Sequence, residues 1–128
     1  MGLQTLGKKD HSWGYEIVWA SNDRYSGKML VFERAGAKTG MLLHKDRAKS
    51  WFVSEGRFKL IFIDTKTGKM TEAVVEQGKT VDLGPLSPHH LESLEPNSVI
   101  IEVGTPDDTD DVIRLSPGDE HAAPEQPT

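Results

Sequence analysis

Residues 40–56 read Gly40-Met41-Leu42-Leu43-His44-Lys45-Asp46-Arg47-Ala48-Lys49-Ser50-Trp51-Phe52-Val53-Ser54-Glu55-Gly56. An apolar run ends at His44, a polar turn follows, and an aromatic run then leads to a second turn at Gly56. Short apolar runs bounded by polar turns are typical of strands. Residues two apart on a strand point to the same face, so His44 and Asp46 are expected to share one. The stretch therefore predicts two strands with polar side chains between them.

The same pattern recurs along the chain. Runs rich in Val, Ile, Phe and Trp are separated by Gly, Pro and polar links, and no capped amphipathic helix longer than two turns is evident. We predict strands at residues 15–19, 28–33, 41–44, 50–53, 57–64, 72–75, 80–83, 98–103 and 111–115. Many short strands with frequent turns indicate an all-β sandwich or barrel.

Composition narrows the class of protein. The chain has 128 residues, which suits a single domain, and it contains no cysteine, so disulfides, thiolate ligands and thiol nucleophiles are excluded. A net charge of −5 argues against nucleic acid or an anionic membrane surface as a partner. No apolar run approaches the roughly 20 residues of a membrane span, and the N-terminus lacks the order of a signal peptide. We therefore expect a cytoplasmic protein.

Three segments are expected. Residues 1–11 form an N-terminal arm that is poor in core material, and residues 12–115 form the barrel. Residues 116–128 hold Pro, Ala and charged residues with no large apolar side chain. Such a tail buries too little to offset its ordering entropy, so we expect it to be flexible.

A second segment, residues 78–90, combines a Gly turn, a strand, a Pro-rich corner and His89 at the start of the next strand. Together with residues 40–56, it resembles the two sequence motifs of the cupin superfamily. In this resemblance His44 matches the first histidine of motif one, Gly56 matches its closing glycine, and His89 matches the histidine of motif two.

The flanking residues resemble one branch, the single-domain mannose-6-phosphate isomerase type II-like cupins. Residues 12–16, Ser-Trp-Gly-Tyr-Glu, are similar to the opening of those proteins, and residues 110–115 are similar to their closing strand. Arg47-Ala48 and Trp51 stand at corresponding places in motif one. The resemblance covers most of the chain and implies an all-β, single-domain cupin fold, a double-stranded β-helix or jelly-roll barrel.

Two positions depart from the cupin metal-binding pattern. Asp46 stands at the second histidine, and Lys49 stands at the glutamate, or Ser50 if the turn is counted one residue longer. The resemblance then leaves His44, Asp46 and His89 as metal ligands, a set that suits Fe and can also hold Mn, Ni or Zn. A lysine at the glutamate position opposes a cation, so the alternative is a degenerate, metal-free site. In that case Lys49 would bind an anionic group.

Further candidates surround this site. Lys49 and His90 are the candidate catalytic residues, as a proton carrier or an anion anchor. His90 is expected to point away from the pocket if His89 points inward, because neighbours on a strand face opposite ways. The candidate ligand-binding residues are Arg47 and Arg114, which suit bidentate phosphate contacts, and Trp51 as a pocket wall.

Three functions are compatible with these motifs. The first is a divalent-metal-dependent, sugar-phosphate isomerase-like enzyme, the second a metal-free ligand-binding or regulatory cupin, and the third a non-haem iron dioxygenase-like enzyme. The expected ligand is a sugar, a sugar phosphate or another small anionic metabolite, because basic residues gather near the proposed pocket. Cupin-type barrels often pair through edge strands, so a homodimer is also expected.

Overall fold

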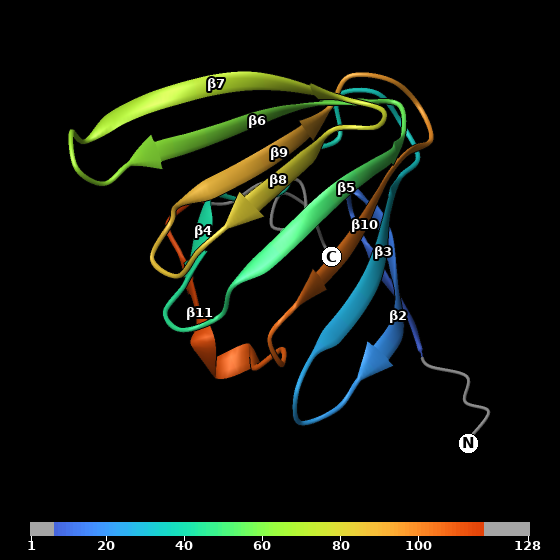
Figure 1. Cartoon of the computed structure of the whole chain (residues 1–128). Helices are drawn as coiled ribbons and strands as arrows, with labels where there is room; N and C mark the ends of the chain where they lie inside the picture. The colour runs from blue at the N-terminus through green and yellow to red at the C-terminus, as the bar shows by residue number, and fades with distance from the viewer. Residues whose placement is uncertain (1–6, 117–128) are drawn as a thin grey trace.

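The computed structural model describes residues 7–116, which form eleven strands and one short 3-10 helix (Figure 1). The first six strands are β1 (Lys8–His11), β2 (Gly14–Ser21), β3 (Ser26–Phe32), β4 (Leu42–His44), β5 (Lys49–Glu55) and β6 (Arg57–Asp64). The others are β7 (Lys69–Glu76), β8 (Thr80–Leu83), β9 (His89–Ser93), β10 (Ser98–Gly104) and β11 (Val112–Arg114), with the helix η1 (Thr109–Asp111) before β11. No α-helix occurs within this range, as the sequence predicts.

The strands make two antiparallel sheets that enclose the interior of a barrel. One sheet has the order β1-β2-β3-β10-β5-β8, and the other has the order β11-β4-β9-β6-β7. Some neighbouring strands are distant in sequence. In one sheet β10 lies between β3 and β5, and in the other β9 lies between β4 and β6 (Figure 1). This arrangement confirms the predicted all-β, jelly-roll barrel.

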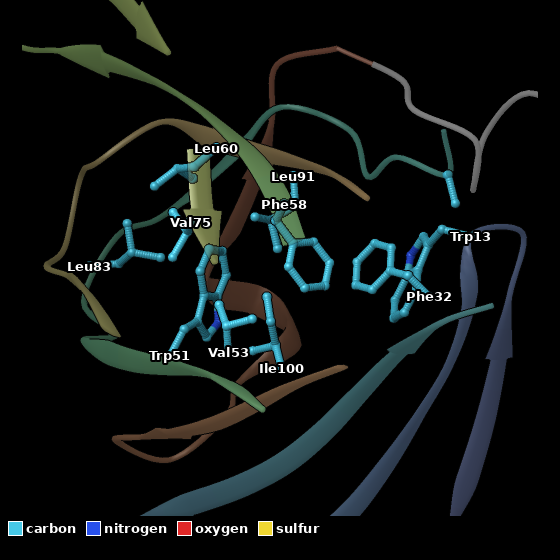
Figure 2. Close-up of a cluster of buried hydrophobic side chains, with 11 residues drawn as sticks. Trp13, Phe32, Trp51, Val53, Phe58, Leu60, Val75, Leu83, Leu91 and Ile100 are labelled. Atoms are coloured by element: carbon cyan, nitrogen blue, oxygen red, sulfur yellow. The ribbon is translucent and has the colours of Figure 1, made fainter. Parts of the chain in front are cut away.

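Aromatic side chains form a large part of the buried hydrophobic cluster between the sheets (Figure 2). The rings of Trp13 and Phe32 are stacked with their centroids 4.4 Å apart, and Phe58 meets Phe32 edge-on at 5.0 Å. Phe58 lies between this stack and a group that includes Trp51 (Figure 2). Burial of large aromatic rings supplies much of the apolar area that holds two sheets together.

The strand boundaries differ from the sequence predictions mainly at the N-terminus. Residues 8–11, assigned to an arm, form β1 and pair with β2, so that Lys8 lies opposite Ile17 and Asp10 opposite Tyr15. This edge strand is polar and contributes little to the core, which is why hydrophobic patterning does not detect it. The proposed flexible tail falls outside the described residues, except for Ser116.

The turn between β5 and β6 depends on Gly56. Its φ angle is +76°, in the left-handed region that favours glycine, and an added Cβ would lie 2.1 Å from Oγ of Ser98. The turn therefore needs glycine both for its conformation and for its close contact with β10. Within residues 7–116, the structure has no helix long and apolar enough to cross a membrane.

Candidate functional site

A cavity of about 670 Å³ lies between the two sheets. Its walls come from both sheets, because inward-facing residues of β2, β3, β5 and β10 meet those of β4, β9 and β11 across the barrel. Trp13, Trp51 and Leu91 belong both to the hydrophobic core and to the lining, so the core forms one wall. The ionisable lining comprises five basic residues, three acidic residues and three histidines: Lys9, Lys28, Arg47, Lys49, Arg114, Glu16, Glu102, Asp107, His11, His44 and His89.

Lys49 extends from the start of β5 into this cavity. Lys49 and Trp51 are two residues apart on the strand, so their side chains share the inward face. The Lys49 ammonium lies 3.5 Å from Nε2 of His44 and 3.6 Å from Oε1 of Glu102, and 5.0 Å from the centroid of the Trp51 ring. Burial lowers the pKa of Lys49, and the carboxylate of Glu102 partly opposes that shift.

His44 is a buried histidine at the end of β4. A protonated lysine only donates hydrogen bonds, so Nε2 of His44 accepts from Lys49 and the ring proton is assigned to Nδ1. That Nδ1 makes no hydrogen bond within the described residues, and it lies 3.6 Å from Oδ2 of Asp111. Burial lowers the pKa of His44 to about 4, with help from the charge of Lys49, so the ring is neutral at pH 7.

His89 enters the cavity from the first residue of β9. Its Nδ1 lies 2.7 Å from the carbonyl oxygen of Ser87, which requires a proton on Nδ1, and its ring meets Trp51 edge-on at 5.4 Å. Burial lowers the pKa of His89 to about 3, and the charge of Lys49 adds to the shift. The cavity therefore contains two neutral imidazoles beside a basic side chain.

Glu102 on β10 is the anionic centre of the site. Its Oε1 accepts a 2.8 Å hydrogen bond from Nε1 of Trp51, and its Oε2 lies 3.0 Å from Nη2 of Arg47. Burial by itself would raise the pKa of Glu102, but the charges of Lys49 and Arg47 lower it to about 2. A fully ionised carboxylate therefore fixes the positions of three surrounding side chains.

Glu102 is not among the site residues that the sequence motifs predict. A signal was available, because the β10 sequence Ser-Val-Ile-Ile-Glu-Val places Glu102 on the same face as the fully buried Ile100. A charged residue at an inward position of an otherwise apolar strand is expensive to bury unless it is paired. That conflict identifies an inward-facing glutamate as part of a polar site.

Arg47 is held by protein groups. Its Nε donates to the carbonyl oxygen of Thr105 at 3.1 Å, and its Nη2 donates to Oγ of Ser26 at 2.8 Å as well as to Glu102. The guanidinium is almost completely buried. Arg47 therefore contributes positive charge to the cavity wall and positions Glu102. Its Nε and Nη2 donate to protein groups.

A second polar chain lines the cavity beside β1 and β2. Nε2 of His11 lies 2.6 Å from Oε1 of Glu16, whose Oε2 is 3.2 Å from the Lys28 ammonium, and Lys28 also pairs with Asp107. Burial would raise the pKa of Glu16, but His11 and Lys28 lower it. Burial would lower the pKa of Lys28, but Asp107 and Glu16 raise it. These paired charges compensate one another, unlike the less completely paired group around Lys49.

Of the remaining predicted site residues, Arg114 lines the cavity, whereas Asp46 and His90 do not. Asp46 is exposed in the β4–β5 turn and does not line the cavity, and its backbone N–H donates to Oδ1 of Asp111 at 2.9 Å. Because β4 ends at His44, the same-face rule for strands does not extend to Asp46. His90 lies outside the lining, with Nδ1 3.3 Å from the carbonyl oxygen of Thr39, whereas Arg114 lines the cavity from β11.

The histidine and carboxylate side chains of the site do not fit a divalent metal. Among residues 7–116, no three His, Cys, Asp or Glu side chains are grouped so that they could share a metal ion. The two cavity histidines instead face the Lys49 side chain, whose charge lowers the pKa of both. An ammonium group beside a divalent metal ion is electrostatically unfavourable. The positive charge of this site is therefore that of Lys49.

The fold and its cavity define a cupin-type barrel. Oxalate decarboxylase from Bacillus subtilis superposes with a TM-score of 0.76 at 15% identity, over 90% of this chain and 33% of its own. KdgF from a Halomonas species has a TM-score of 0.69 at 19% identity, over 81% and 89%. CapF from Staphylococcus aureus, a capsular polysaccharide assembling protein, has 0.76 at 19%, over 87% and 34%.

This chain therefore spans about one third of the oxalate decarboxylase and CapF chains and nearly all of KdgF. No protein-family model matches the sequence, and no curated protein matches it. At these identities the likeness shows the cupin fold alone. The narrower resemblance to mannose-6-phosphate isomerase type II-like cupins stays a prediction.

Proposed function

We propose that the barrel binds a small anionic metabolite, such as a sugar phosphate or a small carboxylate, with Lys49 as its anchor and without a divalent metal. The observation that carries this proposal is the position of the Lys49 ammonium inside the cavity, 3.5 Å from His44 and 3.6 Å from Glu102. A desolvated ammonium gains more from an anionic partner than an exposed one, because screening by water is reduced.

The charge balance of the lining supports an anion. Five basic residues face three acidic ones, although the whole chain carries a net charge of −5. His44 and His89 are neutral near pH 7 and add hydrogen-bonding capacity without charge. A cavity of about 670 Å³ is in the range of small-molecule sites, roughly 300–1,000 Å³.

The names of the structural neighbours are in keeping with this ligand class. One acts on oxalate, a small dicarboxylate, and another is named for capsular polysaccharide assembly. The isomerase-like and dioxygenase-like alternatives both depend on a metal held by His44, Asp46 and His89, and Asp46 lies away from the two histidines. The metal-free alternative therefore has the better support.

Calorimetric titration with a hexose, a hexose phosphate, oxalate and inorganic phosphate tests the proposal. We expect saturable binding of at least one anionic compound by the metal-free protein, and at least a tenfold weaker affinity in Lys49→Met. Lys45→Met is the matched control, because Lys45 is exposed in the adjacent turn and outside the cavity lining. Binding that needs added metal and is unchanged in Lys49→Met would overturn the proposal.

A further inference from the structure

Lys49, His44 and Asp111 form a connected series of side chains beside the cavity. Nζ of Lys49 lies 3.5 Å from Nε2 of His44, and Nδ1 of the same ring lies 3.6 Å from Oδ2 of Asp111. A weak nucleophile next to a base that is oriented by a third group is the arrangement by which proteins activate such nucleophiles. Contacts of this kind are often long in a ligand-free protein and shorten when a substrate binds. The series, which we call the lysine triad, therefore places an amine next to its base.

Asp111 is held firmly at the end of the helix η1. Its Oδ1 accepts from the backbone N–H of Asp46 at 2.9 Å, and its Oδ2 accepts from that of Arg47 at 3.0 Å. These bonds fix the β4–β5 turn, which joins His44 to Lys49, around the carboxylate. Nδ1 of His44 is nevertheless buried without a hydrogen-bond partner among the described residues. A buried unpaired donor costs stability, so the contact with Lys49 explains the position of the ring better than stability does.

The surroundings of Nζ suit both a free amine and a cation formed from it. Burial lowers the pKa of Lys49, which increases the fraction of uncharged, nucleophilic amine. Oε1 of Glu102 lies 3.6 Å from Nζ, and the centroid of the Trp51 ring lies 5.0 Å from it. Both groups stabilise a positive charge on this nitrogen. A cation that replaces the ammonium would therefore stay paired.

The same cavity has a place for an acid group. β11 pairs with β4 so that Val112 lies opposite His44 and Arg114 lies opposite Leu42, and all four residues line the cavity. Arg114 therefore stands one inward position, about 7 Å along the strand, from the level of His44. A guanidinium suits a carboxylate because it can donate two parallel hydrogen bonds. A small acid bound by Arg114 would lie within reach of the lysine triad.

We propose that Lys49 forms a Schiff base with a small carbonyl compound that carries an acid group, such as a 2-oxo acid. The inference rests on the proposed function, because it specifies which anionic metabolites the cavity takes. It also gives Lys49 a covalent role, with His44 as the base and Arg114 as the partner of the acid group.

The bond changes balance without a further reactant. After His44 takes a proton from the ammonium, the lone pair of Nζ forms a bond to the carbonyl carbon, and the π electrons of the carbonyl move to its oxygen. His44 carries two of the ammonium protons to that oxygen in turn, and the oxygen leaves as water. The remaining N–H stays on the iminium, so an ammonium and a carbonyl compound give an iminium and water. The positive charge stays on Nζ, beside Glu102.

Trapping with sodium cyanoborohydride tests the proposal. The reagent reduces an imine of pyruvate to a stable secondary amine, which mass spectrometry detects as one carboxyethyl group per chain. We expect this group on Lys49 in the metal-free protein and none in Lys49→Arg, which keeps the positive charge but lacks the primary amine. Lys45→Arg is the matched control, because Lys45 is exposed in the β4–β5 turn and outside the cavity lining.

The role of His44 has its own readout. His44→Gln should slow formation of the adduct at least about tenfold, because the base is lost, while circular dichroism shows the barrel unchanged. His90→Gln is the control and should leave the rate unchanged, because His90 lies outside the lining. Equal rates in the two variants would overturn the assignment of His44 as the base.

Lactate, the matched acid without a carbonyl group, separates this inference from the proposed function. Saturable calorimetric binding of pyruvate and lactate, with no adduct on Lys49, would overturn the Schiff base and leave the proposed function in place. Adducts spread over surface lysines, at the same level in Lys49→Arg, would overturn it as well. If neither acid binds, nor any of the anions named above, both proposals fail.

Discussion

Nζ of Lys49 lies 3.5 Å from Nε2 of His44 in the interior of the barrel. The two residues come from the consecutive strands β5 and β4, so the short turn between these strands brings them together. Only the imidazole can accept in this contact, which makes the lysine a fixed positive charge beside a neutral ring. The same ammonium also faces Glu102, so the site contains its own counter-ion pair.

Replacing this lysine with a carboxylate should create metal affinity. In Lys49→Glu the repulsive ammonium is removed and an oxygen donor joins His44 and His89, which gives two imidazoles and one carboxylate within one cavity. We expect Lys49→Glu to bind Mn, Ni or Zn at one per chain, while the unmodified protein stays below a tenth of that amount. Elemental analysis after dialysis against each metal measures the difference.

Lys49→Gln separates charge removal from ligand creation. It removes the ammonium without adding a carboxylate, so we expect metal uptake well below that of Lys49→Glu. We expect the charge of Lys49 to keep a metal ion out of the site. Stoichiometric metal in the unmodified chain, removed by a His44→Ala, His89→Ala double substitution, would contradict this expectation.

Glu102→Gln should destabilise the protein strongly. The substitution leaves the buried charges of Arg47 and Lys49 without their carboxylate, and removing one partner of a buried ion pair costs about 3–5 kcal/mol. The amide oxygen can still accept from Trp51, so most of the loss should be electrostatic. Urea unfolding measures the free energy.

The exposed pair of Glu95 and Arg57 provides the control for that experiment. Its atoms are 2.7 Å apart, but both side chains are almost half exposed, and exposed pairs contribute about 0–1 kcal/mol. Glu95→Gln should therefore change the free energy of unfolding by less than about 1 kcal/mol. Equal losses in the two variants would show that the Glu102 network is not a buried ion-pair site.

Much of the barrel could be predicted because its strands carry their own signals. The range predicted for β6 coincides with the observed strand, and His44 and His89 follow from motif spacing and both line the cavity. These features depend on local sequence, where apolar runs and turn residues act over a few positions. The structure thus confirms the fold that short-range patterns predict.

Features that depend on long-range packing were not predictable in the same way. Glu102 becomes the anionic centre only because β10 lies beside β5, which brings it to Trp51 and Arg47. The alternation of side chains along a strand predicts that Asp46 shares a face with His44, but β4 ends at His44 and the rule does not reach Asp46. Pairing partners and strand ends are set by the whole sheet, which is why sequence spacing alone misplaces such side chains.

Stability should fall as the pH is lowered from 7. The pKa of His44 is about 4 and that of His89 about 3 in the folded protein, against 6.5 for the unfolded chain. Below pH 6.5 the unfolded chain therefore binds more protons than the folded one, and the free energy of unfolding decreases by up to about 1.4 kcal/mol per pH unit for each histidine. Glu102, with a pKa near 2 against 4.5, adds a further loss below pH 4.5.

Urea unfolding at pH 7.5, 6.5, 5.5 and 4.5 measures this slope. We expect little change above pH 6.5 and a loss of several kcal/mol by pH 4.5. His89→Gln should remove about half of the slope between pH 6.5 and 4.5, because one of the two buried imidazoles no longer titrates in the unfolded chain. A profile that is flat in this interval would mean that the histidines are accessible to protons in the folded state.

Gly56→Ala should be much more damaging than Gly68→Ala. The φ angles are similar, +76° and +73°, so both alanines incur the left-handed backbone penalty of about 1–2 kcal/mol. The surroundings differ, because a Cβ at Gly56 would lie 2.1 Å from Oγ of the fully buried Ser98, whereas nothing lies within 4 Å of a Cβ at Gly68. The comparison therefore isolates the packing cost at the β5–β6 turn. We expect urea unfolding to show a loss near 1 kcal/mol for Gly68→Ala and a loss at least 2 kcal/mol larger for Gly56→Ala. Equal losses would show that β10 moves away from the turn at little cost, and that the close contact with Ser98 does not hold the turn in place.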